Sequence, residues 1–258
     1  MRVSRKTTLV FLPALVISIS LGFLMADEAR AAETAVVDSD GDGLSDVRET
    51  TVYFTDPLKA DTDGDGFDDA GELTNGYSPR QGNRARLLDL DSDKDGLNDG
   101  WELALGTGLM NPDTDGDSHK DGEEVRSGYD PTDAAGVRLE KVIRVDADAH
   151  RLTYYLGDRM LETFLISAGK PATPTPRGEF KILQKLPVVR YVGRGYNYPN
   201  TKWNMLFTRQ NGHGYYIHGA YWHSKWGRGV SGGCVNVQYS RMERLYAWAD
   251  VGTRVVVD

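Results

Sequence analysis

The chain has 258 residues, a net charge of −8 at pH 7 and a hydrophobic content of 40%. This length accommodates one large domain or two modest ones. An acidic chain without a cluster of Lys and Arg cannot neutralise many phosphates, so the composition excludes general nucleic-acid binding.

The chain begins with the pattern of an export signal. Three basic residues within the first six positions precede an almost wholly apolar run over residues 9–25. Ala29-Arg30-Ala31 then supplies the small residues of an A-x-A motif, so we predict a signal peptide over residues 1–31, cleaved before Ala32. The alternative is an uncleaved membrane anchor, because the run approaches the roughly 17 residues that span a bilayer. We expect an exported protein of the periplasm or cell envelope, with membrane contact only through an uncleaved signal segment.

Residues 38–133 repeat one acidic pattern four times, with starts at Asp38, Asp61, Asp91 and Asp113. Four matching copies indicate an array of repeats rather than a single globular core. Each copy places carboxylates at positions 1, 3, 5, 9 and 12, and Ca²⁺ takes about six to eight such oxygen ligands. The predicted calcium ligands are Asp38, Asp40, Asp42, Asp46, Glu49, Asp61, Asp63, Asp65, Asp69, Glu72, Asp91, Asp93, Asp95, Asp99, Glu102, Asp113, Asp115, Asp117, Asp121 and Glu124.

A glycine at position 6 allows the sharp turn of the loop in the first three copies, at Gly43, Gly66 and Gly96. Ser118 stands there in the fourth copy, so we expect a strained turn and the weakest site. The spacing fits the calcium loop of the EF-hand, but the apolar residue falls at position 7 instead of 8, and no long helix precedes the first two loops. The array instead resembles bacterial thrombospondin type 3 repeats.

The alternative for this region is a disordered acidic spacer, because crowded carboxylates repel one another and stay solvated without ions. For bound calcium we expect an affinity of the extracellular type, on the order of 10⁻⁴–10⁻³ M. Since the ions bind only the folded form, loading is expected to turn the array into a stiff stalk.

The composition changes near residue 137, and we predict a linker over residues 134–138 and a second domain over residues 139–258. Period-two alternation of apolar residues predicts β-strands in this domain. They are expected at residues 142–145, 151–156, 160–168, 178–183, 215–218 and 253–257, with a hairpin turn at Gly157-Asp158. One helix is expected over residues 241–250. The predicted fold class is mainly β, with two packed sheets, one main helix alongside and an N-terminal Asp-rich array.

Cys234 is the only cysteine, so no internal disulfide can form and its thiol is either buried and inert or reactive. A histidine such as His218 can take the thiol proton or stabilise the thiolate as an ion pair. Gly232 and Gly233 allow a sharp turn, so the amides of Gly233 and Cys234 are predicted to form an oxyanion hole. The structural alternatives are a small buried apolar cysteine and a structural histidine.

Three segments carry a family resemblance. They are TPTPRGEF at residues 173–180, His218-Gly219, and SGGCVN at residues 231–236. In type and order they resemble the motifs of the YkuD-type L,D-transpeptidase domain, over residues 139–258. The resemblance implies a YkuD-like β-sandwich, catalysis by Cys234 and His218 without a cofactor, and a backbone carbonyl that orients the histidine.

The resemblance also implies a reaction. Cys234 would be acylated by a peptidoglycan stem peptide at the L-centre of a diaminopimelate residue, with release of a D-amino acid. The acyl group would pass to an amine acceptor, which cross-links the wall or attaches a wall protein. One alternative is an L,D-carboxypeptidase or hydrolase that uses water as acceptor. The other is a non-catalytic, calcium-dependent wall-binding module with a relic fold.

Further residues are assigned around these motifs. The expected substrate contacts are Ser231, Asn236, Tyr221, Trp222 and Arg228. The last three are expected in a lid or groove wall, against the alternatives of packing aromatics and a surface arginine. Many family members have a second histidine where this chain has Gly232, which leaves the acylation rate and the substrate preference open. His213 and His223 lie near His218 in the sequence, but neither is followed by glycine.

Overall fold

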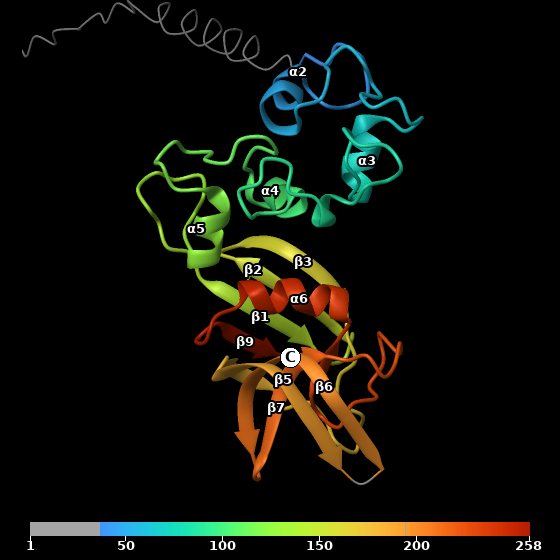
Figure 1. Cartoon of the computed structure of the whole chain (residues 1–258), viewed down its shortest axis with the longest axis vertical. Helices are drawn as coiled ribbons and strands as arrows, with labels where there is room; N and C mark the ends of the chain where they lie inside the picture. The colour runs from blue at the N-terminus through green and yellow to red at the C-terminus, as the bar shows by residue number, and fades with distance from the viewer. Residues whose placement is uncertain (1–36, 194) are drawn as a thin grey trace, which may run out of the picture.

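The computed structural model describes residues 37–193 and 195–258, so the predicted signal peptide lies outside the described residues (Figure 1). Within the described part of the chain, no helix has the length and apolar character needed to cross a membrane.

The C-terminal half consists of two sheets. The first has the order β3-β2-β1-β9-β4 and the second the order β5-β6-β7-β8. The strands of the first sheet are β1 (Lys141–Asp146), β2 (Arg151–Leu156), β3 (Arg159–Leu165), β4 (Gly178–Lys181) and β9 (Arg254–Val257). Those of the second are β5 (Gln184–Gly193), β6 (Tyr196–Gln210), β7 (His213–Gly219) and β8 (Val235–Val237). The mainly β fold class predicted from the sequence is confirmed.

The long hairpin of β5 and β6 was not predicted. Most residues of β5 are exposed or only partly buried. A strand that buries neither face has no apolar alternation in its sequence, so the period-two criterion misses it. The strand predicted over residues 160–168 also ends early, at Leu165, because the chain beyond it makes single bridges from Ser167 to Asn236 and from Gly169 to Ser231.

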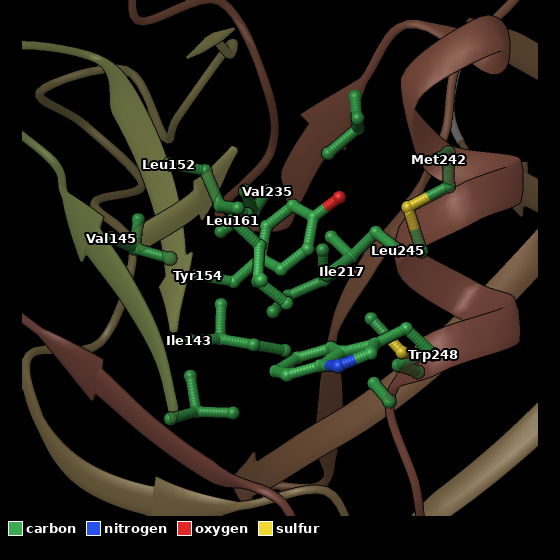
Figure 2. Packing of buried hydrophobic residues seen from close by; sticks show 14 of the residues in the cluster. Ile143, Val145, Leu152, Tyr154, Leu161, Ile217, Val235, Met242, Leu245 and Trp248 are labelled. Carbon is green, nitrogen blue, oxygen red and sulfur yellow. The ribbon is translucent and has the colours of Figure 1, made fainter. Parts of the chain in front are cut away.

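The helix α6 (Tyr239–Trp248) covers the core between the sheets. Met242, Leu245 and Trp248 of α6 point toward Tyr154 of β2 and toward Ile217 of β7 (Figure 2). These side chains are buried on one helix face, as the spacing predicted. The core thus joins both sheets and holds β7 and β8 in place.

The repeats contain short helices that the sequence analysis did not assign. They are α2 (Asp46–Arg48), α3 (Asp69–Asn75), α4 (Asp99–Leu105) and α5 (Asp121–Ser127), with a π-helical turn η2 (Glu49–Tyr53) and a 3-10 turn η3 (Leu87–Asp89). Gly76, Gly106 and Gly128 end α3, α4 and α5 in the left-handed conformation that glycine adopts freely. Residues 134–138 belong to a turn closed by a bridge between Tyr129 and Arg138, so the proposed linker folds back on the fourth repeat.

Candidate active site and calcium loops

The turn before β8 is fixed by Ser231. Its Oγ donates to the carbonyl oxygen of Cys234 at 2.5 Å and accepts from the amide of Gly233 at 3.0 Å. Gly233 has φ +116°, and a Cβ there would lie 2.7 Å from the ring of Tyr215. Glycine is therefore required at this position. Ser231 is buried with its hydroxyl engaged in this turn, and its role as a substrate contact stays a prediction.

The same contact involves one of the two amides predicted to form the oxyanion hole. The amide of Gly233 already donates to Ser231 Oγ, so it does not point freely at a developing oxyanion. The amide of Cys234 therefore remains as the proposed hydrogen-bond donor to the oxyanion. Gly232 is different, because it is exposed and a Cβ there meets nothing within 4 Å. The space around Gly232 would therefore admit a side chain, such as the second histidine that many family members have at this position.

His218 is oriented by the backbone. Its Nδ1–H donates to the carbonyl oxygen of Gly219 at 2.9 Å, the kind of contact that the family resemblance implied. This tautomer leaves Nε2 unprotonated and able to accept a proton. The ring of Tyr191 stacks on the imidazole with a centroid distance of 4.8 Å. On the parallel pair β7–β8, His218 is in register with Asn236, two residues beyond Cys234.

The electrostatics favour an uncharged Cys–His pair at rest. Burial lowers the pKa of His218 to about 4, and desolvation raises the pKa of the Cys234 thiol to about 11, against a contact from the amide of Tyr216. Cys234 keeps partial solvent access. The arrangement fits proton removal by a neutral imidazole during attack better than a pre-formed ion pair.

The TPTP segment (residues 173–176) makes hydrogen bonds to this turn and to the neighbouring Gly169. Thr175 Oγ1 accepts from the amide of Gly169 at 2.9 Å, and Thr173 Oγ1 donates to the carbonyl of Ser231 at 3.3 Å. The motif therefore positions the cysteine turn rather than presenting reactive groups of its own.

An aromatic wall lies next to His218. The ring of Trp222 stacks on Tyr198 of β6 at 3.9 Å and lies 5.8 Å from the imidazole. Tyr221 is exposed and donates from its hydroxyl to the carbonyl of Pro199 at 2.7 Å. These contacts place the expected wall beside the histidine. Arg228 is exposed and its carbonyl accepts from Ser167 Oγ at 2.8 Å.

His223 is a site residue that sequence reasoning passed over. Its Nε2 lies 3.0 Å from the side-chain amide of Asn236, which is buried in β8. The side chain of Asn236, which was predicted to contact the substrate, therefore already has a hydrogen-bond partner within the protein. Nothing in the spacing of His223 marks it, because the loop after β7 brings it back to β8 only in the folded chain.

The repeats gather carboxylates as predicted for positions 1, 3 and 5. In each repeat, one ligand atom from each of these three residues lies within 4.8 Å of the others. The glutamates at position 12 are buried and have oxygens that accept no hydrogen bond within the described residues. These residues are Glu49, Glu72, Glu102 and Glu124. Orphaned buried carboxylate oxygens beside other carboxylates fit a bound cation with oxygen ligands.

The aspartates at position 9 make hydrogen bonds within their own loops. In the second repeat, Asp69 accepts from the amide of Thr62 at 2.8 Å and from its hydroxyl at 2.7 Å. Asp46, Asp99 and Asp121 make the same pair of contacts with position 2 of their repeats. Both oxygens therefore close the loop, and since each keeps a lone pair, the ligand role of these four residues stays a prediction.

Burial raises the pKa values of the glutamates in these loops. Desolvation, followed by repulsion from neighbouring aspartates, raises the pKa of Glu102 to about 10 and the pKa values of Glu72 and Glu124 to about 7. A cation in the loop would offset both effects. Ser118 adopts φ +79°, as expected for a strained turn, where the three glycines at position 6 have φ of 96° to 101°.

Comparisons with known proteins match both halves. The family model of the L,D-transpeptidase catalytic domain, YkuD, matches residues 140–257, and that of the bacterial TSP3 repeat matches residues 38–60 and 91–107. The YkuD proteins of Bacillus licheniformis and Bacillus subtilis strain 168, both provisionally named L,D-transpeptidases, are each 30% identical to this chain. These alignments cover 45% of this chain, and 64% and 65% of the two relatives.

Solved structures show similar partial coverage. An L,D-transpeptidase from Mycobacterium smegmatis is 30% identical, with a TM-score of 0.44, over 48% of this chain and 60% of its own. A variant of an Enterococcus faecium L,D-transpeptidase is 29% identical, with a TM-score of 0.42, over 46% of this chain and 50% of its own. The chain carries a YkuD-type L,D-transpeptidase catalytic domain preceded by bacterial TSP3 repeats, which confirms both resemblances predicted from its motifs.

Proposed function

We propose that this protein is an exported cysteine L,D-transpeptidase of the peptidoglycan layer. The observation that carries the proposal is the geometry at the end of the second sheet. The turn that holds Cys234 packs against β7, and the Nδ1–H of His218 is engaged by Gly219, which leaves Nε2 as a base. The proposed divisions are a signal peptide at residues 1–31, repeats at 38–133, a linker at 134–138 and a catalytic domain at 139–258.

The proposed reaction has two steps. The sulfur of Cys234 attacks the carbonyl carbon at the L-centre of a diaminopimelate residue while Nε2 of His218 takes the thiol proton. The amide bond to the terminal D-amino acid breaks, and the imidazolium returns the proton to the leaving amine. An amine acceptor then attacks the thioester, gives a proton to His218 and releases the thiol. The amide of Cys234 is the proposed donor to the oxyanion in both steps.

The proposed substrate is a peptidoglycan stem peptide, with an amine of a second stem or of a wall-attached protein as acceptor. Tyr221 and Trp222 are proposed to form the wall that excludes water from the thioester. Water as acceptor would give an L,D-carboxypeptidase instead. No cofactor is proposed for the chemistry, and positions 1, 3, 5 and 12 of the repeats are proposed to hold structural calcium.

Mass spectrometry of a purified tetrapeptide muropeptide incubated with the mature protein in calcium tests this function. We expect a dimer or an exchanged terminal residue with the unmutated protein and no product with Cys234→Ala. Tripeptide alone would move the assignment to a carboxypeptidase, and turnover by Cys234→Ala would falsify the nucleophile.

A histidine pair tests the proposed base. His218→Ala is expected to slow acylation by about 10²–10⁴-fold, because it removes the proton acceptor. His213→Ala is the matched control at the other end of β7 and is expected to keep the full rate. Equal losses in both variants would show that the histidine acts only through the stability of the strand.

One observation favours a second candidate function. A thiol pKa raised to about 11 is what a cysteine without catalytic activation would have. Under this candidate the chain is a calcium-dependent wall-binding module. Alkylation of Cys234 as a function of pH, with and without stem peptide, separates the two. A thiol that stays unreactive below pH 9 in both conditions, together with no muropeptide product, supports the binding module.

A further inference from the structure

The helix α4 of the third repeat is shared between a calcium loop and the core of the catalytic domain. Its Trp101 is buried in the same hydrophobic cluster as Tyr154 and Trp248. The rings of Trp101 and Tyr154 meet edge to face, with centroids 5.7 Å apart and planes at 79°. Leu97, Leu105 and Val125 belong to the same cluster. The catalytic core is therefore completed by side chains from the third and fourth repeats.

The next residue of the same helix belongs to the calcium loop. Glu102 is 0% exposed, and neither of its carboxylate oxygens accepts a hydrogen bond from any residue that the structure describes. Its charged neighbours are all acidic: Asp93, Asp95, Asp99 and Asp121. A buried carboxylate among like charges must either take up a proton or be compensated by a cation or another partner. The position of α4 therefore depends on what the third loop binds.

Polar contacts add to this junction. Lys141 of β1 donates from Nζ to the carbonyl of Arg126 in α5 at 2.6 Å and to that of Trp248 in α6 at 2.8 Å. Asp95 of the third loop accepts from the amide of Gly122, the second residue of α5, at 2.6 Å. The third loop thus reaches the catalytic domain both through α4 and through α5.

The loops of the first two repeats lack such contacts. Only the end of the second repeat reaches the catalytic domain, through an ion pair of Asp89 with Arg244 at 3.3 Å and through Leu88, which packs against the shared cluster. Within the described residues 37–80, no side-chain hydrogen bond or ion pair reaches residues 139–258, and none of these residues enters the shared cluster. In Figure 1, α2 and α3 lie away from the sheets, whereas α4 and α5 lie beside β2 and β3. The two pairs of repeats therefore differ in what a bound ion can stabilise.

We propose that the cation of the third repeat is a structural metal of the catalytic domain, because its ligand Glu102 holds the helix whose Trp101 fills the wall of the catalytic core. The inference rests on the proposed calcium binding of the repeats. It assigns the third site to folding of the catalytic domain, and the first two sites to the outer part of the array alone.

Hydrogen exchange of the full mature chain, read by mass spectrometry on peptides from β2 and β3, tests this assignment. For a dissociation constant of about 10⁻⁴–10⁻³ M, about 10 mM calcium favours the bound form about 10- to 100-fold. We expect removal of calcium to speed exchange in β2 and β3 by a factor in this range. The measurement uses the unmutated protein, so it does not depend on the folding of a variant.

Two matched substitutions locate the effect. In calcium, Glu102→Gln is expected to speed exchange in β2 and β3 about as much as calcium removal does. Glu49→Gln, at the same position of the first repeat, is expected to change exchange only in the first two repeats. Equal effects of both variants on β2 and β3 would overturn the assignment to the third site.

The failures of the inference and of its premise give different patterns. If calcium removal speeds exchange in the repeats but leaves β2 and β3 unchanged, calcium binding stands and the structural role in the catalytic domain is wrong. If neither region responds to calcium, the proposed calcium sites are wrong and the inference falls with them.

Discussion

Two buried glutamates, one in each half of the molecule, are stabilised in different ways. Glu162 of β3 accepts from the hydroxyl of Tyr154 at 2.8 Å and from Arg241 at 2.6 Å, and Arg244 lies within 3.3 Å. Glu102 of α4 is also buried, but among residues 37–193 and 195–258 neither of its oxygens finds a hydrogen-bond donor. The catalytic half compensates the buried charge of Glu162 with its own side chains, whereas the described repeats offer Glu102 no such partner.

The largest expected effect separates these two cases directly. Glu162→Gln is expected to lower the free energy of unfolding by about 3 kcal/mol with or without calcium, because it leaves two arginines without their partner. Glu102→Gln is expected to destabilise only in calcium. In metal-free protein the raised pKa keeps the Glu102 carboxyl protonated, and glutamine resembles that neutral form, so the stability should be close to that of the unmutated chain. Urea unfolding in both conditions measures the pair, and equal losses in metal-free protein would contradict the comparison.

The pH dependence of the metal-free repeats is the next test. The folded pKa values of Glu72 and Glu124 are about 7, above the ordinary value of 4.5. The folded form holds these protons longer than the unfolded form, so stability is present below pH 4.5 and is lost as the pH rises toward 7. The loss is roughly 3 kcal/mol per site. In calcium the trend reverses, because the ion binds the deprotonated carboxylates.

Thermal unfolding of the repeats from pH 4.5 to 7.5, in metal-free buffer and in calcium, measures both trends. A metal-free midpoint that rises with pH would show that these glutamates find partners within the protein.

The smallest expected effect concerns the turn of the fourth loop. Ser118→Gly is expected to stabilise this repeat by about 1 kcal/mol and to tighten its calcium site, because glycine adopts φ +79° without strain. The reverse change in the second repeat, Gly66→Ser, is expected to weaken that site by a similar amount. Calcium titration of the two variants checks the pair, and a Ser118→Gly protein with unchanged affinity would show that the turn is not strained.

Local patterns predicted much of this molecule. The turn at Gly157, the helix face of Met242 and Leu245, and the loop carboxylates at positions 1, 3 and 5 all follow from spacing within a few residues. Such patterns are readable because neighbouring residues of a strand, helix or tight loop meet at fixed offsets. Strand β5 carries no such pattern, since it buries neither face, and most of the buried residues of β6 form one short run without alternation.

Pairings between distant segments could not be predicted in this way. The contact of His223 with Asn236 and the contact of Trp101 with Tyr154 join residues whose separation along the chain has no fixed geometric meaning. The occupation of the Gly233 amide by Ser231 is local, but the motif alone does not show which acceptor the amide meets.

The sequence by itself determined the chemistry that is available: one thiol, a histidine beside a glycine, and four loops of carboxylates. The tertiary structure decided which of these groups are already partnered and which are not. It gave hydrogen-bond partners to the amide of Gly233 and to the aspartates at position 9. Within the described residues it left the carboxylate of Glu102, next to the catalytic core, without one. The reason is physical, because burial and hydrogen bonding depend on surfaces that come together only when the repeats pack on the sheets.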